Sequence, residues 1–175
     1  MIKFKDILES KILVPRKLDT RKEDEKRVIL QRIQQYIKDG SKGDLDLDNT
    51  PITSLPDNLK TVGGYLSLFN TPVISLPDNL EVVGGLFLGN SKITSLPDNL
   101  KVGGDLYVNN TTITLLPDNL EVGGDLYLFV TRITSLPKSL KVEGSLHLYN
   151  TPISKKYSRE EIKKMVPGVK GEVKV

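Results

Sequence analysis

The chain of 175 residues contains no cysteine and no tryptophan, and His147 is its only histidine. Without cysteine it can form no disulfide and no Cys–His nucleophilic site, and a reducing compartment suits it. A zinc centre is not expected, because its usual ligands are cysteine and clustered histidine. A lone histidine among aromatic residues is more often a surface residue than a catalytic base. The sequence therefore predicts a non-enzymatic protein that needs no cofactor or metal, and cytoplasmic location is the expectation.

Long apolar runs are also missing. None approaches the roughly 20 residues that span a bilayer, and Met1–Ser10 is too charged for a secretory signal. Residues 1–40 carry 11 Lys and Arg against 7 Asp and Glu, and residues 150–175 carry 7 against 3. The middle of the chain carries 7 against 12, and an acidic middle argues against a nucleic-acid groove because phosphate binding needs positive charge. Neither a membrane nor a nucleic acid is an expected partner.

A repeat of about 20 residues fills residues 43–153. Each copy opens with two leucines or valines spaced by two, such as Leu126 and Leu128, and this alternation predicts a short strand with those side chains turned inward. A fixed period of this length is typical of a solenoid, in which stacked copies bury one continuous core. A column of Thr or Ser is expected to bond the backbone of the next turn. A column of alternating charge is expected on the far side: Lys60, Glu81, Lys101, Glu121 and Lys141.

The consensus of the copies is Leu-x-Leu-x-x-Thr-x-Ile followed by Leu-Pro-x-x-Leu. It resembles the leucine-rich repeat family in a short bacterial or phage style, with Thr or Ser in place of the usual Asn. The resemblance implies an α/β solenoid with one parallel β-sheet, turns or short 3₁₀ pieces on the other side, and use as a protein-binding scaffold. A parallel β-helix is the alternative fold, which two or three strands per turn would select. Paired glycines, such as Gly123-Gly124, predict tight bends with positive φ.

Three segments follow from these patterns: a helical N-terminal cap at 1–42, leucine-rich repeats at 43–153, and a C-terminal cap at 154–175. Apolar residues at roughly helical spacing predict a short helix within residues 1–15. A Thr-x-x-Glu capping box and an apolar stripe predict a second helix at 21–39, which either covers the open end of the stack or faces a partner.

The C-terminal cap is predicted to hold a helix and a strand. Ser158 and Glu161 form a second capping box at the start of a short apolar stripe. Residues 171–175 copy the opening of a repeat, which predicts a seventh strand over the last sheet edge. A monomer is expected.

The strand residues between the inward leucines are the candidate functional residues, because alternate side chains of a strand face opposite sides. Seven of the ten Phe and Tyr fall there. Exposed aromatic residues are favoured at protein interfaces, and neighbouring acids would attract a basic partner. The predicted partner-binding residues are Tyr65, Phe69, Phe87, Tyr107, Tyr127, Phe129, His147, Tyr149, Asp46, Asp105 and Asp125. The alternative is a cross-strand aromatic ladder that only stabilises the sheet.

Together these features predict a protein-binding module that uses the aromatic and acidic face of its sheet. Short Thr-type repeats with compact charged ends are similar to products of tailed-phage genomes, which implies a phage-encoded adaptor or inhibitor in the host cytoplasm. The alternative is a structural or head-packaged virion protein whose repeats serve only as a scaffold. Met1–Ser10 is similar to the leaders that direct proteins into phage heads, and Ile7-Leu-Glu9 is similar to the sites cut there.

Overall fold

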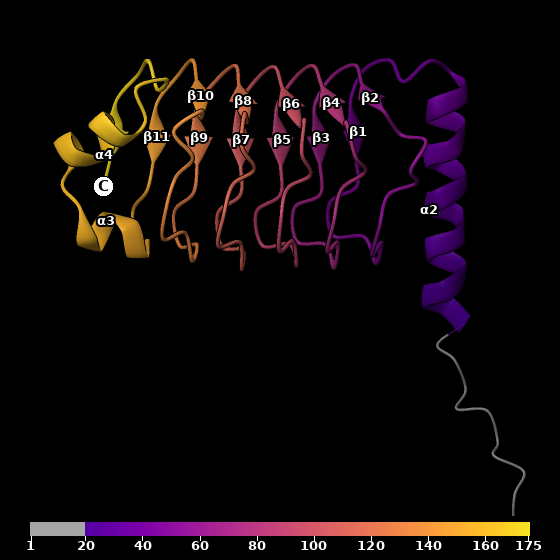
Figure 1. Cartoon of the computed structure of the whole chain (residues 1–175). Helices are drawn as coiled ribbons and strands as arrows, with labels where there is room; N and C mark the ends of the chain where they lie inside the picture. The colour runs from indigo at the N-terminus through magenta and orange to yellow at the C-terminus, as the bar shows by residue number, and fades with distance from the viewer. Residues whose placement is uncertain (1–19) are drawn as a thin grey trace, which may run out of the picture.

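The computed structural model describes residues 20–175, which form a stack of parallel turns with helices at its ends (Figure 1). The predicted solenoid with a period of about 20 residues is therefore confirmed. The short helix expected within residues 1–15 and the cut site expected near Glu9 lie outside the described residues. None of the helices within residues 20–175 is long and apolar enough to cross a membrane.

The first sheet has seven parallel strands, in the order β1-β3-β5-β7-β9-β11-β12. Each strand pairs in register with its neighbours, so that the first residues of the strands form one buried column. The strand expected within residues 171–175 is present as β12. The strands are β1 Leu45–Asp46, β3 Leu66–Ser67, β5 Leu86–Phe87, β7 Leu106–Tyr107, β9 Leu126–Tyr127, β11 Leu146–His147 and β12 Val173–Lys174.

A second parallel sheet corrects the expectation of a single one. Five two-residue strands pair in register where turns or 3₁₀ pieces were expected, and each has an exposed first residue and a buried valine. Two strands per turn is the arrangement that favours the parallel β-helix alternative. The strands are β2 Thr61–Val62, β4 Glu81–Val82, β6 Lys101–Val102, β8 Glu121–Val122 and β10 Lys141–Val142.

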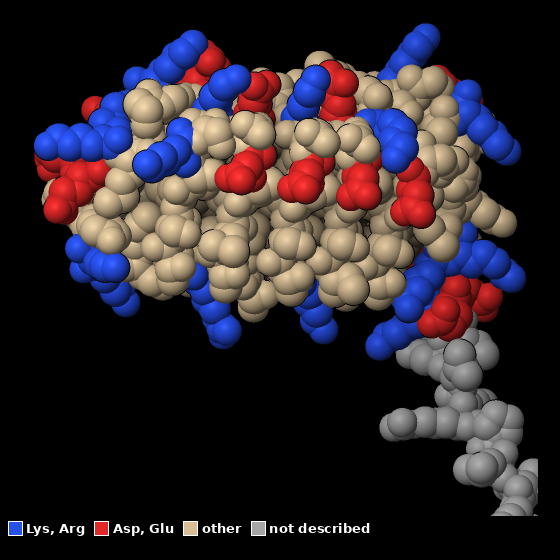
Figure 2. Space-filling view, in the orientation of Figure 1, with Lys and Arg blue, Asp and Glu red and all other residues tan. Residues whose placement is uncertain are grey.

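The exposed residues of the second sheet form the column of alternating charge, with one correction. Glu81, Lys101, Glu121 and Lys141 are in register, but the residue aligned ahead of them is Thr61. The first turn has one more residue than the others, and Lys60 precedes the strand. Figure 2 shows blue and red side chains alternating along the upper edge of the stack. The column contains one ion pair, Lys141 Nζ to Glu121 Oε1 at 2.6 Å, and exposed pairs of this kind contribute little to stability.

Leucine, isoleucine and valine side chains from both sheets form one continuous core along the stack. The hydroxyl column lies beside this core, and here the expectation was wrong. The Thr71 hydroxyl donates to the carbonyl of Leu68 at 2.7 Å, and Thr131 donates to Leu128 at 2.6 Å. These bonds stay within one turn, because the chain bends immediately after each first-sheet strand and brings the hydroxyl over the preceding carbonyl. The hydroxyls thus stabilise the bend and supply a hydrogen bond to a buried backbone carbonyl.

The paired glycines do not have the positive φ that the sequence predicts. Among the described glycines only Gly40 and Gly43 have φ between +20° and +160°. The pairs are needed because successive turns meet backbone to backbone. A Cβ on Gly124 would lie 2.9 Å from the carbonyl carbon of Gly104, and a Cβ on Gly123 would lie 2.1 Å from the Gly103 carbonyl oxygen. Any side chain at these points would push the turns apart.

Asparagine takes the positive φ at the bend instead, as its short polar side chain allows. In five turns the residue before the hydroxyl column is an Asn with φ between +55° and +58°. In the remaining turn it is Val130, with φ +57°. A β-branched residue in this region is strained, and Val130 also leaves 48% of its surface exposed.

We therefore expect Val130→Asn to stabilise the protein. Removing the strain should raise the free energy of unfolding by about 1 kcal/mol, because little buried surface is lost. Urea denaturation measures the change. The reverse substitution in the preceding turn, Asn110→Val, should lower the free energy of unfolding by a similar amount, and unchanged stability in both variants would show that the bend imposes no strain.

Helices close both ends of the described chain (Figure 1). Helix α2, Thr20–Lys38, buries Ile29 and Ile33 against the first turn, and the Tyr36 hydroxyl lies 2.8 Å from the carbonyl oxygen of Gly43. At the other end, α3, Pro152–Lys156, was not predicted, and α4, Arg159–Met165, begins at the Ser158 capping box. Helix α4 contacts β12, so the last turn is held by its own helix.

Candidate functional site

The central outward column of the first sheet is a stack of aromatic rings. The ring centroids of Phe87 and Tyr107 are 5.0 Å apart, those of Tyr107 and Tyr127 are 4.1 Å apart, and those of Tyr127 and His147 are 4.2 Å apart. The ring planes lie within 8° to 24° of parallel, and all four side chains are half-buried. Because the rings cover one another's faces, they present their edges to solvent. Such neighbours also stabilise the sheet.

Further rings flank this stack and enlarge it. Tyr65 packs edge-on against Phe87 at 6.0 Å, and Phe129 packs edge-on against Tyr127 at 6.4 Å. Tyr149 lies 6.5 Å from His147 and is 44% exposed. The structure therefore brings seven of the predicted ring residues into one connected cluster across five turns.

Phe69 stands at the edge of this surface, 40% exposed. Its ring lies over Gly89 of the next turn, where a Cβ would be 3.2 Å from Cδ2 of Phe69. Ser67, which is buried and pairs with Phe87, has no ring, so the ring stack begins one turn later at Phe87. The sequence predicted Phe69 correctly as outward-facing, but it could not show that Phe69 and Tyr149 are the most exposed rings of the face.

The acidic residues have a structural task that the sequence did not reveal. The Oδ1 atom of Asp44 accepts a hydrogen bond from the N–H of Tyr65 at 2.9 Å, and Oδ1 of Asp105 accepts one from the N–H of Asp125 at 2.8 Å. In the following turn Asp125 accepts one from Ser145 N–H at 2.7 Å. Each carboxylate thus joins its turn to the next.

Asp46 is the predicted acid that does not bridge turns. It is exposed in β1, and its Oδ1 accepts a hydrogen bond from the N–H of Asp48 two residues later, at 3.0 Å. Asp48 bridges instead, since its Oδ1 accepts from the N–H of Phe69 at 2.8 Å and from the Ser67 hydroxyl. The exposed acid therefore lies in the first turn, away from the ring stack, which begins two turns later.

Asp125, Tyr127 and His147 form the most connected polar group on this face. Oδ2 of Asp125 lies 3.0 Å from Nε2 of His147 and 3.3 Å from the Tyr127 hydroxyl. The pKa of Asp125 is lowered, first by the Ser145 N–H and then by His147 and Tyr127, while burial opposes the shift. The pKa of Tyr127 is raised, mainly by the neighbouring Tyr107 hydroxyl and by burial. At neutral pH the group is an ionised carboxylate held beside a protonated phenol, an arrangement that favours rigid positioning.

Loss of this charge should weaken the fold in a pH-dependent way. A carboxyl with a lowered pKa in the folded state stabilises the protein above its ordinary pKa of 3.8, and this contribution disappears as the pH falls through the folded value. Asp125→Asn should therefore have a lower free energy of unfolding than the wild type at about pH 5, and the difference should shrink below about pH 4. Denaturant unfolding across this range measures it.

Asp98→Asn is the matched control, because Asp98 is an exposed acid in a Pro-Asp-Asn segment away from the ring face. It should stay close to the wild type throughout. A stability difference for Asp125→Asn that is the same at pH 5 and at pH 3 would contradict the role given to the carboxylate charge.

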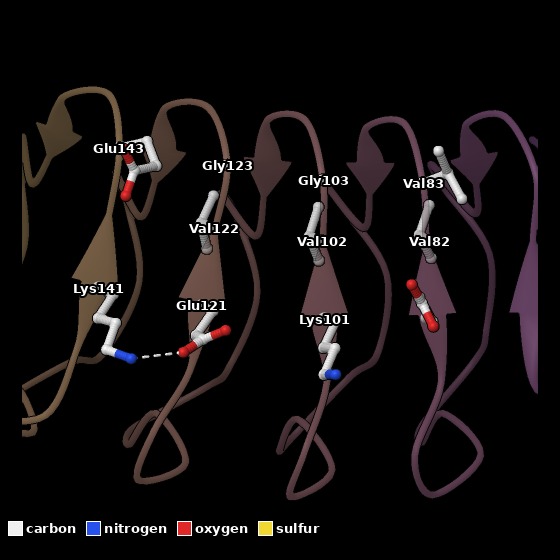
Figure 3. Close-up of a pocket in the computed structure, with 11 residues that line it drawn as sticks. Val82, Val83, Lys101, Val102, Gly103, Glu121, Val122, Gly123, Lys141 and Glu143 are labelled. Carbon is white, nitrogen blue, oxygen red and sulfur yellow. Dashed lines mark hydrogen bonds and ion pairs between the residues drawn. The ribbon is translucent and has the colours of Figure 1, made fainter.

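A groove lies on the second sheet, away from the ring face, and it was not predicted. It has a volume of about 500 Å³ and lies beside the alternating charges, and its floor is formed where Gly103 and Gly123 lack side chains between Val83 and Glu143 (Figure 3). The groove follows from two successive glycines in one column, whose pairing with a neighbouring glycine predicted only tight bends. Within residues 20–175 no group of three or more acidic or histidine side chains is arranged to hold a metal ion.

Comparison with known proteins gives no family to which the chain can be assigned. No protein-family model matches it, and no curated protein matches it. The functional argument therefore depends on the geometry and chemistry of the surfaces.

Proposed function

We propose that the protein is a non-enzymatic protein-binding module whose binding surface is the aromatic and acidic face of the first sheet. The observation that carries the proposal is the connected cluster of rings across five turns, with exposed Phe69 and Tyr149 on its borders. Aromatic side chains dominate binding energy at interfaces because they bury a large area with few rotatable bonds.

The rigidity of this face supports the proposal. Stacked rings and carboxylates that bond the next turn hold the side chains in place before a partner arrives. A preorganised surface loses less conformational entropy on binding than a flexible one. The half-buried rings would supply the centre of the interface, and the more exposed Phe69 and Tyr149 would reach into the partner.

The acids define the kind of partner that fits. Asp105 and Asp125 lie beside the rings, where each accepts a hydrogen bond from the next turn, and Asp46 is exposed at the edge of the face. We propose a protein partner with Lys or Arg around an apolar centre, since complementary charge favours association and selects the partner. A monomer presents this whole face.

A scaffold role is the alternative, and one observation favours it. The 4.1 Å separation and 8° angle of Tyr107 and Tyr127 are those of a ladder that stabilises the sheet by itself. In that case the protein would be a structural or head-packaged virion component.

The family and the source are also proposals. The Leu-x-Leu and Leu-Pro-x-x-Leu columns support a relation to leucine-rich repeats, with the second parallel sheet as the feature that sets these turns apart. The resemblance to phage products supports an adaptor or inhibitor that acts in the host cytoplasm.

A double substitution of the two most exposed rings separates binding from stability. Phe69→Ser with Tyr149→Ser removes two rings that are 40% and 44% exposed, so the free energy of unfolding should fall by only about 1–2 kcal/mol and the double variant should stay folded. Affinity capture from host cytoplasm, followed by titration with the purified captured protein, should show that the wild type binds and the double variant does not.

Leu115→Ser is the matched control, because Leu115 is 59% exposed and lies outside the sheet face. It should bind the captured protein as the wild type does. If the double variant binds equally well, or if the control also loses binding, the ring face is not the interface and the scaffold alternative is favoured.

A further inference from the structure

The exposed column of the second sheet has a charge order that is complementary to itself. From the first turns to the last it runs Glu81, Lys101, Glu121, Lys141. In the opposite direction the order begins with lysine, so two such columns that face each other and run in opposite directions place every acid opposite a base. A two-fold axis parallel to the strands, midway between Lys101 and Glu121, produces this arrangement. It places Lys101 opposite Glu121 of a second copy and Glu81 opposite Lys141 of that copy.

The glycines beside this column have the same centre of symmetry. Gly103 and Gly123 lie next to the two central charges and form the floor of the groove of about 500 Å³, with Val83 and Glu143 at its ends (Figure 3). The axis that pairs the charges therefore also places each glycine opposite the other glycine of the second copy. Because side chains are missing there, the aliphatic stems of the facing lysines and glutamates have room to lie flat. Charge order and groove thus indicate the same arrangement.

Two of the four charges have no ion-pair partner within residues 20–175. Glu81 and Lys101 are exposed, and none of the ion pairs in this part of the chain includes them. The other two, Lys141 and Glu121, contact each other at 2.6 Å. A facing copy would supply partners to the first two charges and extend the existing pair into a network. Networks of charges contribute more than isolated surface pairs.

The spacing of the charges favours a second copy over a peptide. Neighbouring strands lie about 4.8 Å apart, whereas side chains on one face of an extended peptide repeat about every 6.8 Å. A peptide along the column would match one charge and miss the next. A second copy has the same spacing, so all four charges meet their counterparts at once. The alternation also offers no continuous positive surface to a nucleic acid.

The acids of the neighbouring bends border this contact. Asp98 and Asp118 are exposed, and each is followed by an asparagine with positive φ, +60° at Asn99 and +62° at Asn119, which turns the chain before the second sheet begins. The acids therefore lie before the corner, at the margin of the contact, where salt screens their repulsion. This repulsion limits the affinity.

We propose that two copies of the protein associate through their second sheets as a two-fold dimer, with the two stacks running in opposite directions. The contact is small and its charges are exposed, so association is weak and the monomer predominates at low concentration. The ring face of each copy takes no part in the contact, so neither proposal depends on the other.

Sedimentation equilibrium of the wild type and two charge reversals tests the dimer. The wild type should show a monomer–dimer equilibrium between about 5 and 500 µM, shifted toward monomer by added salt. Lys101→Glu places acid opposite acid at two points of the dimer, and Glu121→Lys places base opposite base, so each variant alone should associate at least about tenfold more weakly. Mixed in equal amounts, the two variants are complementary at every position of the column. Their heterodimer should form with an affinity within about threefold of the wild-type dimer.

Two controls accompany this experiment. Lys92→Glu changes the net charge as Lys101→Glu does, but Lys92 is exposed in the bend after β5 and does not line the groove. It should dimerise as the wild type does. Phe69→Ser with Tyr149→Ser should also dimerise normally, because the ring face is not used. Equal thermal unfolding midpoints of Lys101→Glu, Glu121→Lys and Lys92→Glu should show that the reversals leave the fold intact.

Four results would overturn the proposal. A wild type that remains monomeric up to about 500 µM would show that a second copy is not the occupant of the groove. Single reversals that associate as the wild type does, or a mixture that fails to associate, would show that these charges do not face each other. A loss of association in Lys92→Glu would make the effect one of net charge alone. Dissociation by the double ring variant would place the contact on the first sheet.

Discussion

The close contact between the backbones of successive turns is the constraint on which the structure depends. At Gly124 a Cβ would lie 2.9 Å from the carbonyl carbon of Gly104 and 2.1 Å from Oδ1 of Asp105, so this position has no room for a side chain of its own. This spacing lets both sheets form their ladders at once, as in Leu126 N–H to Ser145 carbonyl at 2.9 Å and Gly123 N–H to Val102 carbonyl at 2.8 Å. It also sets the 4.1 Å separation of the Tyr107 and Tyr127 rings. The continuous core, the hydrogen bonds of both sheets and the columns of surface residues all depend on this one spacing between successive turns.

The sequence predicted the parts of the fold that depend on side-chain periodicity. The leucine columns gave the first sheet, and the Ser158 capping box gave α4, because each pattern has a direct physical cause in the chain. The second sheet was missed for a different reason. Leu100, Lys101 and Val102 show the same alternation of apolar and polar residues as a first-sheet strand, but the resemblance to leucine-rich repeats implied turns on that side. A glycine selected for positive φ and one selected for close approach look alike in sequence, which explains the wrong prediction for Gly123-Gly124.

The candidate site was predicted as a set of outward residues, and the structure groups seven of its ring residues into one connected cluster. The sequence could not show how much of each ring is exposed to solvent. Tyr107 and Tyr127 cover each other's faces, whereas Tyr149 is 44% exposed, and this difference depends on ring orientation. The role of Asp105 was equally hidden, because its carboxylate bonds the N–H of a residue one turn later.

The identical register of neighbouring turns has an evolutionary consequence. Because every central turn meets the next through the same backbone contacts, one turn can replace another as a structural unit. Duplication or deletion of a coding segment of one period would lengthen or shorten the stack without disturbing the helices at either end. The row of rings would then grow or shrink by one ring at a time, so that the reach of the surface is set by copy number and its chemistry by the residue at each outward position.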